Sequence, residues 1–305
     1  MTQKDLKTVA VIGGGLIGAS WAALFARAGG YLVRAWDPSE AARESFADRA
    51  DKAAKQLVQL GYRAEGSVTV VETLAGAVHG VDWVQENAPE SVELKTKLYR
   101  EIEPAAPQGA VIASSTSSLR WSDLSQGLAH PKRFILAHPF NPPHLMPLVE
   151  LYGQDDEVLA RAEIFYRGLD RETVRLKREV AGHLANRLAS ALWREAVSLV
   201  EEGVADVADI DRALVNGPGL RWSIIGAHMA YHLGGGAGGI EHYLQHLGPS
   251  QERRWKTLGN PQLTPELCAK LVAGIAEEAA GRSIDDLEKE RDAKLMATLR
   301  LRTKQ

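Results

Sequence analysis

Short apolar runs alternate with longer amphipathic segments in the first half of the chain. The runs predict strands at Thr8–Ile12, Tyr31–Trp36, Val68–Val71, Asp82–Gln85, Ala110–Ala113, Phe134–Ala137, Leu148–Tyr152 and Thr173–Leu176. Helical spacing of the apolar residues predicts helices between most of them, at about residues 16–29, 39–60, 91–103 and 155–168. Strands and helices that alternate in this way predict an α/β fold with a doubly wound, mainly parallel sheet.

The second half of the chain has a different pattern. Strand-like runs stop near Ala181, and a stripe at helical spacing predicts one long amphipathic helix through Ala185, Ala189, Leu192 and Ala196. We therefore predict an α/β domain over residues 1–182 and an all-α domain over residues 183–305. One copy of such a helical array is too apolar to leave exposed, so we also predict a homodimer.

Composition agrees with two globular domains and argues against several classes of protein. A chain of 305 residues corresponds to about two domains of ~150 residues. Lys and Arg number 36 against 39 Asp and Glu, and without a basic excess or a basic run we expect no nucleic-acid partner. The single cysteine, Cys268, excludes an internal disulfide, and no Cys or His group has the spacing of a metal site. No apolar run reaches the ~18 residues that span a membrane, so we expect a cytoplasmic protein.

A glycine-rich segment, Gly13-Gly14-Gly15-Leu16-Ile17-Gly18, follows the first predicted strand and satisfies the pattern G-x-G-x-x-G. Gly13 would allow a tight turn, Gly15 a close approach to a pyrophosphate, and Gly18 tight packing of the helix on the sheet. The second strand ends at Asp37, where a carboxylate accepts ribose hydroxyls and repels a 2′-phosphate. The pattern predicts a Rossmann-type domain that binds NAD through Gly13, Gly15, Leu16, Ile17, Gly18 and Asp37. The alternative is a glycine-rich turn with Asp37 as a capping residue.

A histidine and a glutamate lie on consecutive apolar strands. His138 ends one strand, and Glu150 lies inside the next, where an unpaired carboxylate would be costly. A strand–turn–strand arrangement would bring Glu150 beside His138, so that the pair holds one tautomer and stabilises the imidazolium. Alcohol oxidation requires such a base, because the hydroxyl proton leaves while hydride passes to the nicotinamide. The alternative is a structural histidine and a glutamate that faces solvent.

Two further polar features lie where a substrate would bind. The cluster Ser114-Ser115-Thr116-Ser117-Ser118 follows a strand, and ligands in open α/β sheets bind outside the carboxyl ends of strands. Its hydroxyls are candidates for binding a substrate oxygen, with a helix N-cap ahead of Leu119 as the alternative. Asn186 lies at the start of the long helix beside the domain boundary, where an asparagine taken alone is most simply solvated.

The order of these motifs resembles the L-3-hydroxyacyl-CoA dehydrogenase superfamily over almost the whole chain. The resemblance rests on the glycine motif, Ser115-Thr116-Ser117-Ser118-Leu119, His138-Pro139-Phe140-Asn141-Pro142, Val149-Glu150 and Gly182-His183-Leu184-Ala185-Asn186-Arg187. It implies that His138 is the general base, with Glu150 as its orienting partner. It also implies that Ser117 and Asn186 surround the substrate oxygen and His138, and that Asp37 binds the adenosine ribose.

The resemblance adds residues to both binding sites. Glu90 and Lys95 match positions that approach NAD, with a solvated first turn of a helix as the alternative. Asn141 joins Ser117 as a substrate-binding residue.

Within the superfamily, the chain is most similar to the branch that holds L-gulonate 3-dehydrogenase (lambda-crystallin) and L-carnitine dehydrogenase. Asn141-Pro142-Pro143 resembles the gulonate enzyme, whereas Leu220-Arg221-Trp222-Ser223 and Arg282-Ser283-Ile284 resemble carnitine dehydrogenases. Two departures from the acyl-CoA enzymes count against a CoA substrate. The helical stretch after Asp37 is shorter, and Arg221–Gly226 replaces a Gly-Pro-Phe-Glu-type segment.

These features predict an NAD-dependent enzyme that oxidises the 3-hydroxyl of a small hydroxy acid, gulonate-like or carnitine-like, to the 3-oxo acid. Arg221 is the candidate for the substrate carboxylate, because a guanidinium fork matches it. Its alternatives are capping a helix or bridging the dimer. Two rival functions stay open: an L-3-hydroxyacyl-CoA dehydrogenase acting on 3-hydroxybutyryl-CoA, and a catalytically silent NAD-binding protein of the crystallin type.

Overall fold

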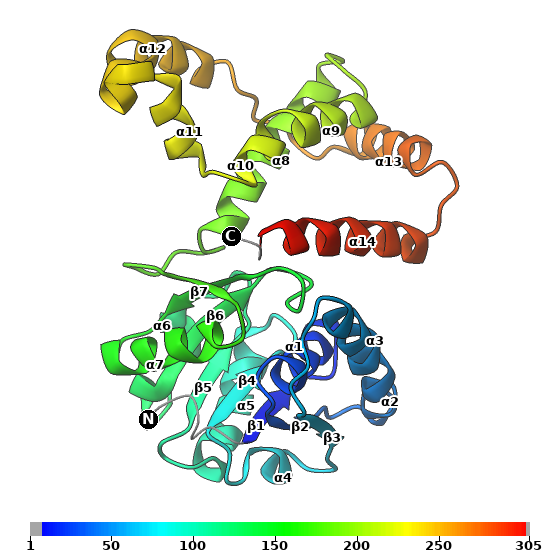
Figure 1. Cartoon of the computed structure of the whole chain (residues 1–305), viewed down its shortest axis with the longest axis vertical. Helices are drawn as coiled ribbons and strands as arrows, with labels where there is room; N and C mark the ends of the chain where they lie inside the picture. Colours follow the sequence, from blue (N-terminus) through cyan, green and yellow to red (C-terminus); the bar gives the residue numbers. More distant parts are fainter. Residues whose placement is uncertain (1–7, 303–305) are drawn as a thin grey trace. The chain divides into compact units, whose positions relative to one another are not determined.

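The first half of the chain forms one sheet of eight strands (Figure 1), seen in a computed structural model that describes residues 8–302. The strand order is β3-β2-β1-β4-β5-β6-β7-β8. The strands are β1 (Thr8–Ile12), β2 (Leu32–Trp36), β3 (Ser67–Val70), β4 (Trp83–Glu86), β5 (Val111–Ser114), β6 (Phe134–Pro139), β7 (Leu148–Tyr152) and β8 (Glu172–Arg175). All neighbouring pairs are parallel except β6 and β7. The predicted doubly wound, mainly parallel sheet is confirmed.

Helices cover both faces of this sheet. They are α1 (Leu16–Arg27), α2 (Glu40–Glu44), α3 (Phe46–Gln59), α4 (Leu74–Val78), α5 (Val92–Ala105), α6 (Trp121–Leu124) and α7 (Asp156–Arg167). Successive side chains of a strand point to opposite faces. Along β1, Val9 and Val11 therefore join one core with α1, α3 and α7, while Ala10 and Ile12 join the other with α4, α5 and α6.

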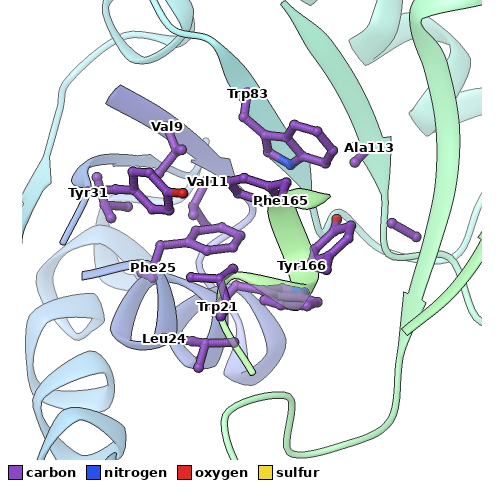
Figure 2. Packing of buried hydrophobic residues seen from close by; sticks show 14 of the residues in the cluster. Val9, Val11, Trp21, Leu24, Phe25, Tyr31, Trp83, Ala113, Phe165 and Tyr166 are labelled. Carbon is purple, nitrogen blue, oxygen red and sulfur yellow. The ribbon is translucent and has the colours of Figure 1, made fainter. Parts of the chain in front are cut away.

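An aromatic cluster fixes α1 against the sheet, as Figure 2 shows. Phe165 on α7 stacks on Trp83 of β4 with ring centroids 4.1 Å apart. Trp21 on α1 lies 5.4 Å from Tyr166 on α7, and both rings are buried. Burial of such rings stabilises by area and by ring geometry together. Helix α1, which follows the glycine motif, is therefore packed firmly against the sheet and α7.

The helical stretch predicted at residues 39–60 is broken at Ser45. The Ser45 hydroxyl donates to the Ala41 carbonyl at 2.7 Å, and Ser45 both ends α2 and precedes α3. A serine that bonds back to the preceding turn competes with the helical ladder. The short helices α4 and α6 were not among the predicted elements.

By compactness the chain divides into two units, one of Met1–Asn186 with Arg291–Gln305 and one of Arg187–Glu290. The remaining helices are α8 (Ala185–Glu201), α9 (Val207–Asn216), α10 (Pro218–Trp222), α11 (Ala227–Gly234), α12 (Gly239–Trp255), α13 (Pro265–Ala279) and α14 (Ile284–Arg302). A helical second half is confirmed. The sequence pattern does not predict that the end of α14 groups with the first unit, and the boundary after residue 182 stays a prediction. Between residues 8 and 302, no helix is long and apolar enough to cross a membrane.

Candidate active site

The glycine motif forms the turn between β1 and α1 with the geometry that its spacing predicts. Gly13 has φ of 100°, and a Cβ there would lie 2.6 Å from the Asn87 carbonyl oxygen. A Cβ on Gly18 would collide with the Gly13 carbonyl. A Cβ on Gly15 would meet no atom within 4 Å, so at this position the backbone faces open space. Gly13 and Gly18 are thus required by the fold, whereas the space at Gly15 suits a ligand.

A pocket of about 580 Å³ lies beside this turn and is lined by Gly15, Leu16, Asp37 and Asn87, among others. Asp37 Oδ2 accepts a hydrogen bond from Gly14 N at 2.6 Å, and Oδ1 accepts one from Ser39 N at 2.8 Å. The following helix α2 is capped by the Ser39 hydroxyl. The carboxylate of Asp37 therefore joins the glycine turn to the wall of the pocket.

The amino end of α1 is suited to phosphate. Within the described residues no side chain caps this helix, so its first N–H groups, including those of Leu16 and Ile17, are available to an anion. Arg49 on α3 donates to the Gly14 carbonyl at 2.6 Å and brings a positive charge to the turn. Together with the space at Gly15 and the carboxylate of Asp37, these groups fit the pyrophosphate and ribose of NAD.

The pair predicted from consecutive strands is present. His138 and Glu150 are register partners in the antiparallel pair β6–β7. Nδ1 of His138 lies 2.8 Å from Oε2 of Glu150, and the two residues are 4% and 2% exposed. Glu150 does not face solvent. The carboxylate accepts the Nδ1 hydrogen, which leaves Nε2 of His138 as the unprotonated nitrogen.

The second oxygen of Glu150 receives the amino end of α8. Leu184 N and Ala185 N donate to Oε1 at 2.7 and 3.1 Å. Burial opposes ionisation of this carboxyl, but the hydrogen bonds from His138 and from these two amides outweigh it and lower the pKa of Glu150. Glu150 is therefore an anion that orients His138 and satisfies free N–H groups of the helix.

Asn186 contacts both His138 and the loop of Ser117. Its Nδ2 donates to the Ser117 carbonyl at 3.1 Å and lies 3.5 Å from Nε2 of His138. The half-buried asparagine thus lies against the free nitrogen of the imidazole, and its role stays a prediction. The structure brings Ser117, His138, Glu150 and Asn186 into one cluster.

Glu90 organises the loop that carries Ser117. Its Oε1 accepts hydrogen bonds from the Thr116 hydroxyl and from the amides and hydroxyls of Ser117 and Ser118, at 2.7–3.1 Å. Burial opposes ionisation, but these bonds and the charge of Lys95 lower the pKa of Glu90 overall. The cap ahead of Leu119 is Thr116, whose hydroxyl accepts from Leu119 N at 3.0 Å. The serines are therefore free of that capping role.

Lys95 is buried rather than solvated. It is 1% exposed, and its ammonium donates to Oε1 of Glu86 at 2.7 Å and to the Ala88 carbonyl at 2.8 Å. Oε2 of Glu90 lies 3.9 Å away. The alternative of a solvated turn is wrong for Lys95, and its role in NAD binding stays a prediction.

The structure does not gather every predicted residue. Asn141 is exposed in the turn after β6, at a cis peptide bond to Pro142. No hydrogen bond among residues 8–302 joins its side chain to His138. Arg221 is exposed on α10 in the second unit. The roles of both residues stay predictions.

Two buried histidines near the site were not singled out from the sequence. The ring of His183 lies 4.8 Å from that of His138, and its Nε2 is 2.9 Å from the Thr116 carbonyl. Burial lowers the pKa of His183. The sequence did offer a signal for His183, because it lies between Gly182 and Asn186 in a motif that carries the family resemblance.

The other histidine, His144, lies between β6 and β7. Its Nδ1 contacts the Ser20 hydroxyl on α1, and its Nε2 lies 2.5 Å from Oε1 of Gln56 on α3. Gln56 in turn donates to Asp292 at 2.9 Å. Burial lowers the pKa of His144 to about 4. A neutral histidine therefore ties the loop between His138 and Glu150 to the helix of the glycine motif.

No cluster of three or more His, Cys, Asp or Glu side chains able to hold a metal ion occurs in the part of the chain that the structure describes.

Hydride transfer from an alcohol to NAD requires a dinucleotide cradle close to a buried proton acceptor. The glycine turn with Asp37 and the His138–Glu150 pair provide these two parts, which define the class of NAD-dependent dehydrogenases. The chain belongs to the 3-hydroxyacyl-CoA dehydrogenase family. Residues 8–180 match the NAD-binding domain of that family, and residues 182–277 match its C-terminal domain. The predicted superfamily and the NAD cofactor are confirmed.

Curated relatives cover nearly the whole chain. An L-carnitine dehydrogenase of Streptomyces coelicolor is 43% identical over 98% of this chain and 96% of the relative. An L-carnitine dehydrogenase of Oceanobacillus iheyensis is 39% identical over 97% of this chain and 98% of the relative. The chain is therefore an NAD-dependent 3-hydroxy acid dehydrogenase of this family, and a silent NAD-binding protein is not supported.

Solved structures agree with the fold. A 5-formyl-3-hydroxy-2-methylpyridine 4-carboxylic acid 5-dehydrogenase, described as an NAD⁺-dependent dismutase, has a TM-score of 0.83 at 29% identity, covering 97% of this chain and 98% of that one. A 3-hydroxyacyl-CoA dehydrogenase of Archaeoglobus fulgidus has a TM-score of 0.64 at 27% identity, with the same coverage. Related folds thus serve different substrates, and the fold alone does not select one.

Proposed function

We propose that this enzyme oxidises the 3-hydroxyl of L-carnitine, or of a closely similar small 3-hydroxy acid, to the 3-oxo acid. The observation that carries the proposal is the similarity to L-carnitine dehydrogenases at about 40% identity along nearly the whole chain. Gulonate, the other substrate that the sequence suggests, becomes an arm of the test.

His138 is proposed as the general base. Its Nδ1 hydrogen is held by Glu150, which directs the lone pair of Nε2 away from that carboxylate. Nε2 accepts the substrate hydroxyl proton, and the adjacent Glu150 anion stabilises the resulting imidazolium. NAD, when bound, supplies the acceptor for the hydride. Because His138 and Glu150 are both buried, their interaction is little weakened by water.

Ser117 and Asn186 are proposed to hold the substrate oxygen. Asn186 Nδ2 lies 3.5 Å from the nitrogen that takes the proton, so an oxygen bound at Nε2 is also within reach of the amide. The Ser117 hydroxyl lies on the loop that this amide contacts. Asn141, exposed in the turn after β6, is proposed as a further substrate contact.

Arg221 is proposed to bind the substrate carboxylate. Its exposed guanidinium offers the two parallel donors that a carboxylate prefers. Arg221→Met should raise the KM for the hydroxy acid far more than the KM for NAD. The lost contact should weaken binding of the acid by about 1.5–3 kcal/mol, as for a hydrogen bond to a charged group. Steady-state kinetics with each substrate varied in turn measure both values. An unchanged KM for the acid would contradict this role and favour the alternatives, in which Arg221 caps a helix or contacts the partner in a dimer.

The deciding experiment follows NAD reduction by absorbance with L-carnitine, gulonate, 3-hydroxybutyrate and 3-hydroxybutyryl-CoA. We expect the highest kcat/KM with L-carnitine and poor turnover of the CoA thioester, which lacks the free carboxylate. Preference for gulonate would move the proposal to the other substrate of the branch. Efficient oxidation of 3-hydroxybutyryl-CoA would overturn it in favour of an acyl-CoA dehydrogenase.

A further inference from the structure

We propose that His183 is a positioning residue for the reaction. Through one hydrogen bond to the loop that carries Ser117, it holds that loop in place beside His138. The proposal deepens the function proposed above and rests on it, because it takes His138 as the base and Ser117 as a ligand of the substrate oxygen. His183 acts through these residues and does not itself touch the substrate.

The backbone of His183 adopts a conformation that residues with a side chain rarely use. Its φ is 49°, and the preceding Gly182 has φ of 76°. A left-handed conformation is unfavourable for a residue with a Cβ, so it persists only where the surrounding structure holds it. Strain of this kind is concentrated at functional sites. The contacts that the His183 side chain makes therefore outweigh the cost of its backbone.

The imidazole of His183 donates to a backbone carbonyl of the serine loop. Nε2 lies 2.9 Å from the carbonyl oxygen of Thr116, and because a carbonyl only accepts, Nε2 carries the hydrogen. Thr116 is 1% exposed, and within residues 8–302 no other donor reaches its carbonyl. An apolar side chain at position 183 would therefore leave a buried carbonyl without a partner, which is costly.

This hydrogen bond is one of three between residues 182–186 and the serine loop. The acceptors are the carbonyls of three consecutive residues, 116–118. The three bonds run from Gly182 N to the Ser118 carbonyl at 3.4 Å, from Asn186 Nδ2 to the Ser117 carbonyl at 3.1 Å and from His183 Nε2 to the Thr116 carbonyl at 2.9 Å. A loop held at three successive carbonyls has little freedom to turn, so Ser117 keeps one position relative to the segment.

The same segment contacts the base. The ring centroids of His183 and His138 lie 4.8 Å apart, and Asn186 Nδ2 lies 3.5 Å from Nε2 of His138. The amides of the two residues between them donate to Glu150, which holds Nδ1 of His138. Loss of the hydrogen bond from His183 would therefore release the serine loop while the His138–Glu150 pair stays intact.

The groups around His183 suit a neutral ring. The titratable groups that face it are His138 on β6, Glu150 on β7 and Glu90 ahead of α5. Burial lowers the pKa of His183 most strongly, and the charge of His138 adds to that effect, against the two carboxylates and the bond to Thr116. A neutral ring places no second positive charge beside His138 when His138 takes up the substrate proton.

The first test separates the hydrogen bond from the packing of the ring. His183→Phe keeps a ring beside His138 and removes the donor, whereas His183→Gln keeps an N–H of similar reach and removes the ring. Steady-state kinetics use the hydroxy acid that the wild type oxidises fastest among the four substrates above. We expect kcat of His183→Phe to fall at least about tenfold, because a small displacement of a positioning group is costly to the rate. His183→Gln should keep most of the wild-type kcat, and the Kd for NAD should be unchanged in both variants.

A residue that only packs against His138 gives the opposite order, with His183→Phe active and His183→Gln impaired. That order, or equal activity of the two variants, would overturn the proposal. Trp121→Phe is the matched control. Its Nε1 also donates to a backbone carbonyl, that of Phe134 at 2.8 Å, but at the first residue of β6, away from His138. This change should lower the melting temperature and leave kcat unchanged.

The second test locates the hydrogen on His183 directly and needs no substrate. In protein labelled with ¹⁵N at histidine, long-range ¹H–¹⁵N NMR spectra show which ring nitrogen of each imidazole carries the hydrogen. The resonances of His183 are those that disappear in His183→Gln. We expect a neutral ring near pH 7 with its hydrogen on Nε2. A hydrogen on Nδ1 alone would leave Nε2 unable to donate to the Thr116 carbonyl and would overturn the proposal.

The two tests keep this inference distinct from the proposed function. If none of the four substrates is oxidised, the proposed function fails, and the NMR result still decides whether His183 holds the serine loop. If a substrate other than L-carnitine is preferred, the order of the two His183 variants is measured with that substrate instead.

Discussion

At the scale of single residues, the chemistry depends on which nitrogen of His138 is left free. Glu150 holds Nδ1 at 2.8 Å, and Asn186 lies 3.5 Å from Nε2. His138→Gln keeps a polar side chain of similar reach but removes the proton acceptor. We expect kcat to fall by about 10²- to 10⁴-fold with NAD affinity nearly unchanged. Turnover close to that of the wild type would remove His138 from the mechanism.

His144 gives a prediction about stability and pH. Burial lowers the pKa of this residue from 6.5 to about 4, against the opposing charge of Asp292. A histidine with a lower pKa in the folded state binds fewer protons there than in the unfolded chain. Its contribution is therefore complete above about pH 6.5 and is lost as the pH falls toward about 4, by roughly 3 kcal/mol in all.

His144→Gln cannot take up that proton, so the free energy of unfolding should depend less steeply on pH across this window. Urea titrations at a series of pH values measure the slope, and His79→Gln, at an exposed position, is the control. Residual slope is expected, because the pKa values of Glu90 and Glu150 are also lowered by folding. A slope identical to that of the wild type would contradict the assignment to His144.

At the scale of elements, the turn between β1 and α1 contains one glycine that leaves room for a ligand and another that the packing of the turn requires. A Cβ on Gly15 meets only open space, whereas a Cβ on Gly18 collides with the Gly13 carbonyl. Gly15→Ala should therefore keep the wild-type melting temperature and weaken NAD binding, since the added methyl occupies the room of the pyrophosphate. Gly18→Ala should lower both the melting temperature and the affinity. Equal effects of the two changes on melting would show that the space at Gly15 is needed by the fold itself.

Also at this scale, the amino end of α8 is hydrogen-bonded to the carboxylate that orients His138. Glu150 accepts hydrogen bonds from Leu184 N and Ala185 N while it holds His138. One carboxylate thus holds both the His138 imidazole and the backbone amides of residues 184 and 185, and Asn186, the next residue, lies against the same imidazole.

At the scale of the whole molecule, the second unit exposes many large apolar side chains. Leu188 on α8 is 73% exposed, Ile224 after α10 is 78% exposed, and Val272 on α13 is 70% exposed. Apolar side chains exposed in such number mark an interface. We therefore propose a homodimer, to be checked by sedimentation velocity at micromolar concentration.

Leu188→Glu should shift the sedimentation coefficient toward that of a monomer, because the partner would have to bury a charge. Ile164→Glu, at a position 54% exposed on α7 of the first unit, is the control and should leave the coefficient unchanged. A wild-type protein that sediments as a monomer would refute the dimer itself.

Much of the fold was predictable because its signals are local. The eight strands lie within a residue or two of the predicted ranges. Most are short apolar runs, whereas the edge strands β3 and β8 alternate polar and apolar residues. The break at Ser45 was not predictable from spacing, since it depends on a hydrogen bond from the Ser45 hydroxyl to the Ala41 carbonyl. The site motifs are predictable for a similar reason, because they lie on or next to strands that the pattern already marks. Gly13–Gly18 and Asp37 follow strands, His138 lies near the end of β6, and Glu150 lies inside β7.

The sequence by itself determined the elements, the glycine turn and the pairing of consecutive strands that sets His138 against Glu150, because these follow from neighbours in the chain. Only the tertiary structure decided which polar groups are buried together. Lys95, nine positions after Glu86, is a typical solvated helix residue by sequence, yet it is 1% exposed. His144 meets Ser20 and Gln56 from far along the chain. A buried charge is tolerated only where folding brings its partner to it, and that partner cannot be read from spacing.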